Sequence, residues 1–314
     1  MTEFRLRDYV QTLFGLLLLG SLLVLVDFSK VLNEVLRTDL RLYALATFLF
    51  FSTYAATAKR WKNLANSVGE QLSLKDSLKT VSVAYGFNQL LPGNSGDIAR
   101  SKIMENYTEV ESHSSLLGAV ALERFYDALV VTAVVVVAAN FVAPAFTASA
   151  AWLVKLFTAA LILFVAAVGF MEYSGRRISF LPERVADALE NFHSGVTSSS
   201  KLKTLENLLL TSYKWIAEIA VFYILAVSLD LNLGAFEAAF VTSSMSLVSS
   251  LPITPAGVGP VEITGVGLLA VSGMASSSSA SLVILQRSIG VLLTALLGTA
   301  VYLSDFRGRA LKSR

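Results

Sequence analysis

Long apolar runs separated by short polar stretches dominate the chain. A helix needs about 20 apolar residues to cross a hydrocarbon core of roughly 30 Å. Six runs are long enough: Tyr9–Val26, Leu42–Ala58, Leu116–Asn140, Trp152–Phe170, Leu208–Leu229 and Ala280–Leu303. Because Asp27 follows the first run in place of the small residues of a cleavage site, we expect a retained span there. The pattern predicts an all-α integral membrane protein with six full transmembrane helices.

Two further apolar segments, Leu74–Met104 and Phe236–Val271, are interrupted by proline and glycine. Proline removes a helical hydrogen-bond donor and glycine loosens the backbone, so neither segment is expected to form one continuous helix. The breaking residues are Pro92, Gly93 and Gly96 in the first segment and Pro252, Pro255, Gly257, Gly259 and Pro260 in the second. Interrupted helices at matching places in two halves of a chain point to the binding site of a transporter.

Basic residues in the connections indicate how the broken segments are placed, because Lys and Arg concentrate in cytoplasmic loops. The basic groups are Arg5 and Arg7; Lys59, Arg60 and Lys62; Arg176, Arg177, Arg184, Lys201 and Lys203; and Arg307, Arg309, Lys312 and Arg314. The connections Phe141–Ala151 and Ser272–Ser281 carry no charge. All the basic groups fall in the cytoplasm if both broken segments are re-entrant helical hairpins. We therefore predict two such hairpins, with both chain ends cytoplasmic.

The same topology makes the single membrane domain an inverted repeat, an architecture common among secondary transporters. Residues 1–145 form the first repeat, and residues 146–314 form the second, which includes a cytoplasmic loop at 171–206. One pattern supports the repeat. An acid in each hairpin is followed at nearly equal spacing by an arginine in the next span, Asp97 by Arg124 and Glu262 by Arg287.

Composition narrows the chemistry. The chain is 54% hydrophobic and 15% charged, well below the roughly one quarter charged that soluble domains have. A net charge of +2 with no long basic cluster gives no reason to expect a nucleic-acid partner. There is no cysteine for disulfides or thiol catalysis and there are only two histidines, so we expect no metal and no cofactor. No nucleotide-binding P-loop motif occurs, so transport would be downhill or ion-coupled.

Polar residues just after the first break suit an anion. Asn94, Ser95 and Asp97 are placed to cap a half-helix, whose free N–H groups and positive end attract phosphate. Arg100 lies one turn beyond Asp97. It either neutralises that carboxylate or reaches the anion.

The second break offers the hydroxyl of Thr254 and the carboxylate of Glu262. Glu262 stands at the start of the outgoing half-helix, where the helix dipole stabilises a negative charge. In an apolar setting the same group would titrate and carry a proton. Both interpretations stay open.

Charges inside the apolar spans form a third group. Glu123, Arg124 and Asp127 lie in the third span, where Glu123 and Asp127 share a helix face. Arg287 is the one charge inside the last span, and Lys214 and Glu218 are spaced to pair at the fifth. Such charges are costly in a membrane and mark either a functional site or a structural ion-pair lock.

Arginine binds phosphate through two parallel hydrogen bonds. Arg100, Arg124 and Arg287 therefore predict a cavity for an amphiphile with an anionic head, balanced by the nearby acids.

Three ordered blocks carry a family resemblance. Asn88–Arg100, Glu123–Asp127 and Pro252–Glu262 resemble the signature blocks of the lysylphosphatidylglycerol synthase transmembrane-region family, a flippase-domain family, over nearly the whole chain. The resemblance implies an inner-membrane lipid translocase, with Asn88 and the other polar residues of the blocks at the substrate site. Ala256 departs from the pattern, because family members often have glycine there. The 314 residues leave no room for the aminoacyl-transferase domain of the fused synthases, so we expect no enzyme activity.

The expected function is movement of an anionic or zwitterionic lipid, a phospholipid or a polyprenyl-phosphate-linked sugar, across the cytoplasmic (inner) membrane through a charged cavity between the hairpins. The alternatives are an ion-coupled transporter of a small solute and a membrane enzyme or scaffold in lipid or glycan synthesis. Contacts with lipid- or glycan-synthesis enzymes and an oligomeric state stay open.

Overall fold

The protein is built from helices. The structure, a computed structural model, describes residues 27–90, 95–105, 107–142, 144–173, 183–251 and 253–310, and these residues contain no strand. The helices are α2 (Phe28–Leu36), α3 (Leu40–Ser67), α4 (Leu74–Leu90), α5 (Ser95–Met104), α6 (His113–Ala138), α7 (Pro144–Tyr173), α8 (Glu183–Thr197), α9 (Lys201–Ser228), α10 (Ala235–Ser249), α11 (Pro260–Val271), α12 (Ser276–Arg287) and α13 (Thr294–Ala310). A 3₁₀ turn, η1 (Pro255–Gly257), precedes α11, and a π-helical turn, η2 (Ser288–Leu293), joins α12 to α13.

The apolar runs expected from the sequence fall on helices. Four of them correspond to α3, α6, α7 and α9, and the last corresponds to the continuous stretch α12–η2–α13. Among the described residues, two helical stretches, Lys201–Ser228 and Ser276–Asp305, are long and apolar enough to cross a membrane by length and composition. The run Tyr9–Val26 lies outside the described residues. The all-helical structure of the described residues is consistent with an integral membrane protein.

One expected boundary is wrong. The sequence placed Lys59, Arg60 and Lys62 in a loop after the span Leu42–Ala58, but α3 continues without a break to Ser67. The segment contains neither proline nor glycine, so nothing in it ends a helix. Arg60 is consequently an interior residue with 1% of its surface exposed.

The first broken segment is a pair of helices, α4 and α5, that fold back on one another. Pro92 and Gly93 lie outside the described residues. Gly96 lies where the start of α5 passes the end of α4, and its N–H donates to the Asn88 side-chain oxygen at 2.8 Å. A Cβ at Gly96 would lie 2.0 Å from the carbonyl oxygen of Ala84, so no larger residue fits.

The second broken segment is the pair α10 and α11, joined through η1. Pro252 lies outside the described residues. Gly257 and Gly259 have φ angles of 68° and 94°, in the left-handed region that residues with a Cβ avoid. Ala256 adopts the same region with φ of 52°. Glycine, which has no Cβ, would adopt this conformation with less strain than alanine.

Proline and glutamate fix the start of α11. Pro260 is its first residue, where a missing N–H costs nothing. Glu262 reaches back and accepts the Gly259 N–H at 2.6 Å, which caps the helix. The glycines before Pro260 therefore interrupt the helix, and Pro260 and Glu262 begin the next one.

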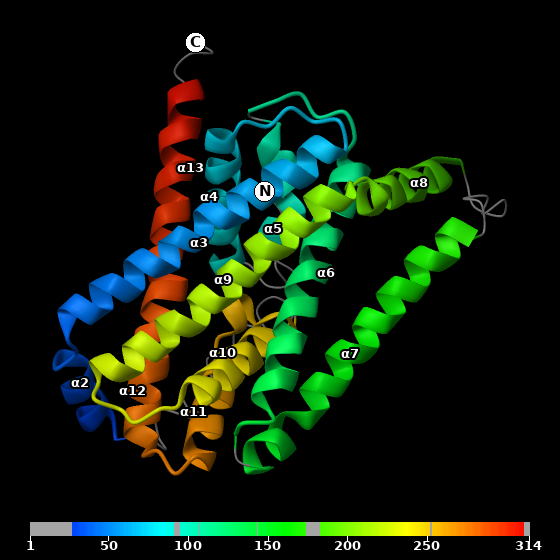
Figure 1. Cartoon of the computed structure of the whole chain (residues 1–314). Helices are drawn as coiled ribbons and strands as arrows, with labels where there is room; N and C mark the ends of the chain where they lie inside the picture. Colours follow the sequence, from blue (N-terminus) through cyan, green and yellow to red (C-terminus); the bar gives the residue numbers. More distant parts are fainter. Residues whose placement is uncertain are drawn as a thin grey trace.

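Three apolar clusters of described residues hold the helices together. One is centred on α9, α10, α11 and α12, with Phe222, Phe240 and Leu269 fully or almost fully buried. A second joins α3, α4 and α6 around Trp61 and Leu116. A third, smaller cluster joins α4 and α5 to α13. Figure 1 shows α3 and α9 running side by side across the molecule, and α7 leaning away from α6 at the edge.

A close crossing of two glycines joins α8 to α6, and it gives a first prediction. A Cβ at Gly118 would lie 2.1 Å from the carbonyl oxygen of Phe192, and one at Gly195 would lie 2.1 Å from that of Ser115. Small residues at such crossings let helix backbones touch in a membrane. We expect Gly118→Ala to lower the free energy of unfolding by about 1–3 kcal/mol, because the helices must separate.

The matched control is Gly267→Ala in α11, where a Cβ would meet nothing within 4 Å. That change is expected to be neutral or stabilising by up to about 1 kcal/mol, the helix propensity of alanine over glycine. Thermal unfolding in detergent, followed by tryptophan fluorescence, measures both. Equal stability of the two variants would show that the α6–α8 crossing is not tight.

Candidate functional site

Eight charged side chains from four helices form one connected group, called here the charge network. Its members are Arg60 on α3, Asp97 and Arg100 on α5, Glu123, Arg124 and Asp127 on α6, and Lys214 and Glu218 on α9. Four are basic and four acidic, so the network is formally neutral. Neutrality with direct pairing is the condition under which charges persist in an apolar interior.

The buried half of the network is centred on two arginines. Arg60 donates to both carboxylate oxygens of Asp127, at 2.9 and 3.0 Å, and to Glu123 at 3.0 Å. Arg100 donates to Glu123 at 2.7 Å and to Asp97, and its guanidinium lies 4.8 Å from the ring centre of Trp61. These contacts tie α3, α5 and α6 together away from solvent.

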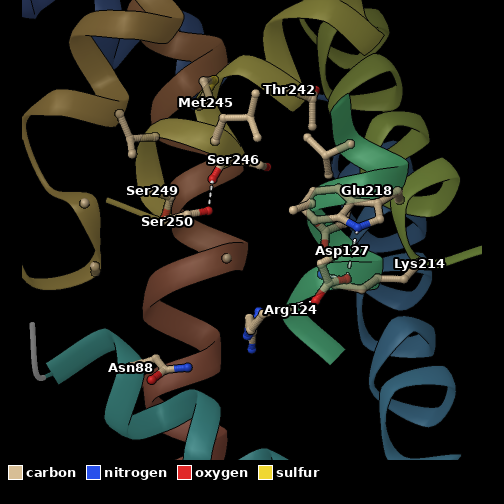
Figure 2. A pocket seen from close by; sticks show the side chains of 18 of the residues that line it. Asn88, Arg124, Asp127, Lys214, Glu218, Thr242, Met245, Ser246, Ser249 and Ser250 are labelled. Carbon is tan, nitrogen blue, oxygen red and sulfur yellow. Dashed lines mark hydrogen bonds and ion pairs between the residues drawn. The ribbon is translucent and has the colours of Figure 1, made fainter. Parts of the chain in front are cut away.

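The other half of the network faces a cavity (Figure 2). Arg124 donates to Asp97 at 2.6 Å and to Asp127 at 3.3 Å, yet 36% of its side chain is exposed. Lys214 lies 3.4 Å from Asp127 and 3.7 Å from Glu218. Of the four basic side chains in the network, Arg124 is therefore the one most open to a ligand.

A second, smaller pair lies at the other broken segment. Arg287 donates from Nε to Glu262 at 2.7 Å and from Nη2 to the carbonyl oxygen of Ala256 at 2.6 Å. Glu262 also caps α11 through Gly259. Arg287 thus fastens α12 to the turn before α11, much as Arg124 fastens α6 to α5.

The cavity has a volume of about 590 Å³, within the usual range for small-molecule sites. Its charged lining consists of Arg124, Asp127, Lys214, Glu218 and Arg287. Figure 2 shows Asp127, Lys214 and Glu218 on one side of Arg124, and Ser246, Ser249 and Ser250 from the end of α10 and the residue after it on the other. The rest of the lining combines aliphatic and uncharged polar residues with seven aromatic side chains: Phe50, Tyr85, Phe125, Phe157, Phe164, Trp215 and Phe222. The cavity therefore provides both charged hydrogen-bonding groups and apolar surface to a ligand.

Comparison with known proteins identifies the family. The family model described as "Lysylphosphatidylglycerol synthase TM region" matches residues 12–298. The chain belongs to this family. It is similar to UPF0104 membrane proteins of two archaea, Methanocaldococcus jannaschii (27% identical, covering 68% of this chain and 92% of the relative) and Pyrococcus horikoshii (20% identical, covering 96% and 98%). A third, from Methanothermobacter thermautotrophicus, is 20% identical and covers 94% of each chain. Membership of a membrane-protein family agrees with the two candidate spans.

In this family member the cavity is lined by five of the predicted substrate-binding residues: Asn88, Arg124, Asp127, Thr254 and Arg287. The hydroxyl of Thr254 donates to the carbonyl oxygen of Val258 at 2.8 Å, which holds the turn. Asn88 faces the cavity while it also receives the N–H of Gly96. Both side chains therefore have a structural contact as well as a place on the cavity wall.

Four other predicted site residues are buried and do not line the cavity. Asp97, Arg100 and Glu123 are buried members of the charge network, and Glu262 holds Arg287. Ser95 begins α5, and Asn94 lies outside the described residues. Arg100 pairs with Asp97, one of the two arrangements expected for it, and direct contact between Arg100 and a phosphate stays a prediction.

Sequence reasoning missed Arg60, Trp61 and Trp215. Arg60 was assigned to a loop, although the buried positions Thr53, Thr57, Arg60 and Leu64 recur at helical spacing and would have placed it on an inward face. Trp215 donates from its indole N–H to Asp127 at 3.1 Å. No local pattern marks such a contact, because its partner lies on a distant helix.

Proposed function

We propose that the protein moves a lipid with an anionic or zwitterionic headgroup between the two leaflets of the cytoplasmic membrane. The observation that carries this proposal is a cavity that combines two arginines, Arg124 and Arg287, with a wall that includes seven aromatic and several aliphatic side chains. A water-soluble ion needs no such wall, and a purely apolar ligand needs no arginine. An amphiphile uses both, and its passage requires no chemical conversion.

Helix lengths support the re-entrant arrangement. α5, α10 and α11 have 10, 15 and 12 residues, which at 1.5 Å per residue is about 15–23 Å. The apolar core is roughly 30 Å thick, so none of these helices crosses it alone. We infer two re-entrant hairpins among six spans, related as inverted repeats with both chain ends in the cytoplasm. Asp97–Arg124 and Glu262–Arg287 are then equivalent pairs, whose partners stand 27 and 25 positions apart.

The cations of the lining support a phosphate headgroup. Three cations and two carboxylates line the cavity: Arg124, Lys214 and Arg287 against Asp127 and Glu218. Arg124 and Arg287 are also paired with Asp97 and Glu262 behind the wall, so a phosphate would bind beside these carboxylates or exchange with them. A guanidinium recognises phosphate through paired N–H donors, and Arg124 has the exposed surface to do so. The lipid would therefore keep its headgroup beside Arg124 while its chains stay in apolar surroundings.

A lipid translocation assay tests the proposal. The purified protein is reconstituted in vesicles that contain a trace of fluorescent phosphatidylglycerol, and a membrane-impermeant reductant quenches the outer leaflet. We expect the inner-leaflet lipid to become accessible faster than in protein-free vesicles. A rate equal to that of protein-free vesicles for anionic and zwitterionic phospholipids and for a polyprenyl-phosphate-linked sugar would refute lipid movement and favour a solute as the cargo.

A further inference from the structure

Helix α7 is the least enclosed helix of the fold. None of its described side chains is buried, and Ile162, Leu163 and Phe170 are more than half exposed. Its partly covered positions, Val154, Phe157, Leu161, Phe164 and Val168, recur every three or four residues and mark a single inward face. One side of α7 therefore faces the protein and the rest is available to lipid.

The two ends of α7 are held differently. Near its start, the ring of Phe141 stacks on Phe236 of α10 with centroids 4.2 Å apart, and Val154 and Phe157 pack against the apolar cluster around α9 to α12. Toward its C-terminal end α7 leans away from α6 (Figure 1). The helix is thus anchored at its beginning and less enclosed beyond Phe164.

Facing apolar stripes on α6 and α7 line the cavity between these ends. They are Ala121, Phe125 and Ala128 on α6 and Phe157, Ala160, Leu161 and Phe164 on α7, and together we call them the α6–α7 portal. Residues at this spacing share one helix face. The rings of Phe125 and Phe164 stack across the portal with centroids 5.0 Å apart and an interplanar angle of 21°. The small alanines on either side leave space that the stacked rings close.

We propose that the α6–α7 portal is the binding site and entrance for one hydrocarbon chain of the lipid. The Phe125–Phe164 stack closes this entrance, and the two rings separate when the chain enters. This inference rests on the proposed lipid translocation. Arg124 belongs to the same helix face as Ala121 and Ala128, so a phosphate at Arg124 brings the attached chain directly onto the stripe. The chain then leaves the cavity sideways into the bilayer, and only the headgroup crosses the protein interior.

A reversible cross-link tests whether positions 125 and 164 must separate during translocation. The chain contains no cysteine, so Phe125→Cys with Phe164→Cys gives a unique pair that a short bis-methanethiosulfonate reagent can join. Translocation of short-chain fluorescent phosphatidylglycerol is followed by albumin extraction of the outer leaflet, so that no reductant cleaves the cross-link during the assay. We expect the cross-link to slow translocation by about tenfold or more, and subsequent reduction to restore it. Undiminished translocation with the pair fully cross-linked would overturn the portal.

The matched control joins two helices that stay packed. Ser52 on α3 and Tyr213 on α9 lie in contact, their hydroxyl groups 2.6 Å apart. Ser52→Cys with Tyr213→Cys, treated with the same reagent, is expected to keep the untreated rate. A loss of rate in this control equal to that at the portal would show that any tether slows the protein, which removes the support from the portal cross-link.

A second measurement separates failure of the portal from failure of the proposed function. Wild-type protein is reconstituted with phosphatidylglycerol that carries a photoactivatable diazirine in one acyl chain, irradiated and mapped by peptide mass spectrometry. The portal predicts labelling of both stripes, Ala121–Ala128 and Phe157–Phe164, whether or not the lipid is translocated. Labelling confined to outward residues such as Ile162 and Leu163 would overturn the portal even if translocation is observed.

Discussion

Arg124→Ala is expected to stop lipid translocation and leave the protein folded. Arg124 is the exposed cation of the charge network, with 36% of its side chain accessible from the cavity. Loss of a charged hydrogen-bonding partner of a buried ligand typically costs about 2–5 kcal/mol. The headgroup would then have no fixed partner at this end of the cavity, so the rate should fall to that of protein-free vesicles.

The fold survives this change because Arg124, unlike Arg60, stands at the cavity, where water can replace its hydrogen bonds, and because both of its partners keep other contacts. Asp97 retains Arg100, and Asp127 retains Arg60, Lys214 and Trp215. Tryptophan fluorescence melting should therefore differ little from that of the wild type. The control is Lys102→Ala, which also removes one positive charge, from a side chain that is 73% exposed on α5 and pairs only with exposed Glu105 among the described residues. Wild-type translocation by Arg124→Ala would refute the headgroup site.

Local sequence patterns predicted those parts of the fold that depend on residues close together in the chain. Apolar runs mark the helices, and proline with glycine marks the two breaks. The spacing of Asp97 with Arg124 and of Glu262 with Arg287 predicted related positions, and each acid contacts its arginine directly. These features lie in single segments or in adjacent helices, where sequence distance and spatial distance agree.

Features that depend on distant helices could not be read from the chain. Arg60 meets Asp127, 67 residues further along, and Trp215 meets the same carboxylate from 88 residues away. A rule that assigns basic residues to loops gives the wrong answer for an arginine whose charge is neutralised in the interior. The aromatic wall of the cavity likewise comes from α3, α4, α6, α7 and α9, and each ring alone looks like an ordinary core or lipid-facing residue.

Arg60→Ala is expected to cause a large loss of stability. Arg60 is almost fully buried and donates to Asp127, Glu123 and the hydroxyl of Thr211. Removing one partner of a buried ion pair typically costs about 3–5 kcal/mol, because the carboxylates left behind are buried without full compensation. The network would carry a formal net charge of −1 away from water. We expect a fall in the melting temperature of about 10 °C, measured in detergent.

Lys59→Ala is the matched control, one position earlier on the same helix. Lys59 lies 3.5 Å from Glu206, and both side chains are more than 40% exposed, so this surface pair should contribute about 0–1 kcal/mol. Arg60→Lys should fall between the two, since it keeps the charge but loses the planar fork that contacts Asp127 at two points. If Arg60→Ala and Lys59→Ala have the same melting temperature, the ion pairs of Arg60 do not hold α3 to α6. A much lower melting temperature for Arg60→Ala than for Lys59→Ala would show that Arg60 stabilises this region, although the basic residues around it in the sequence suggest a loop.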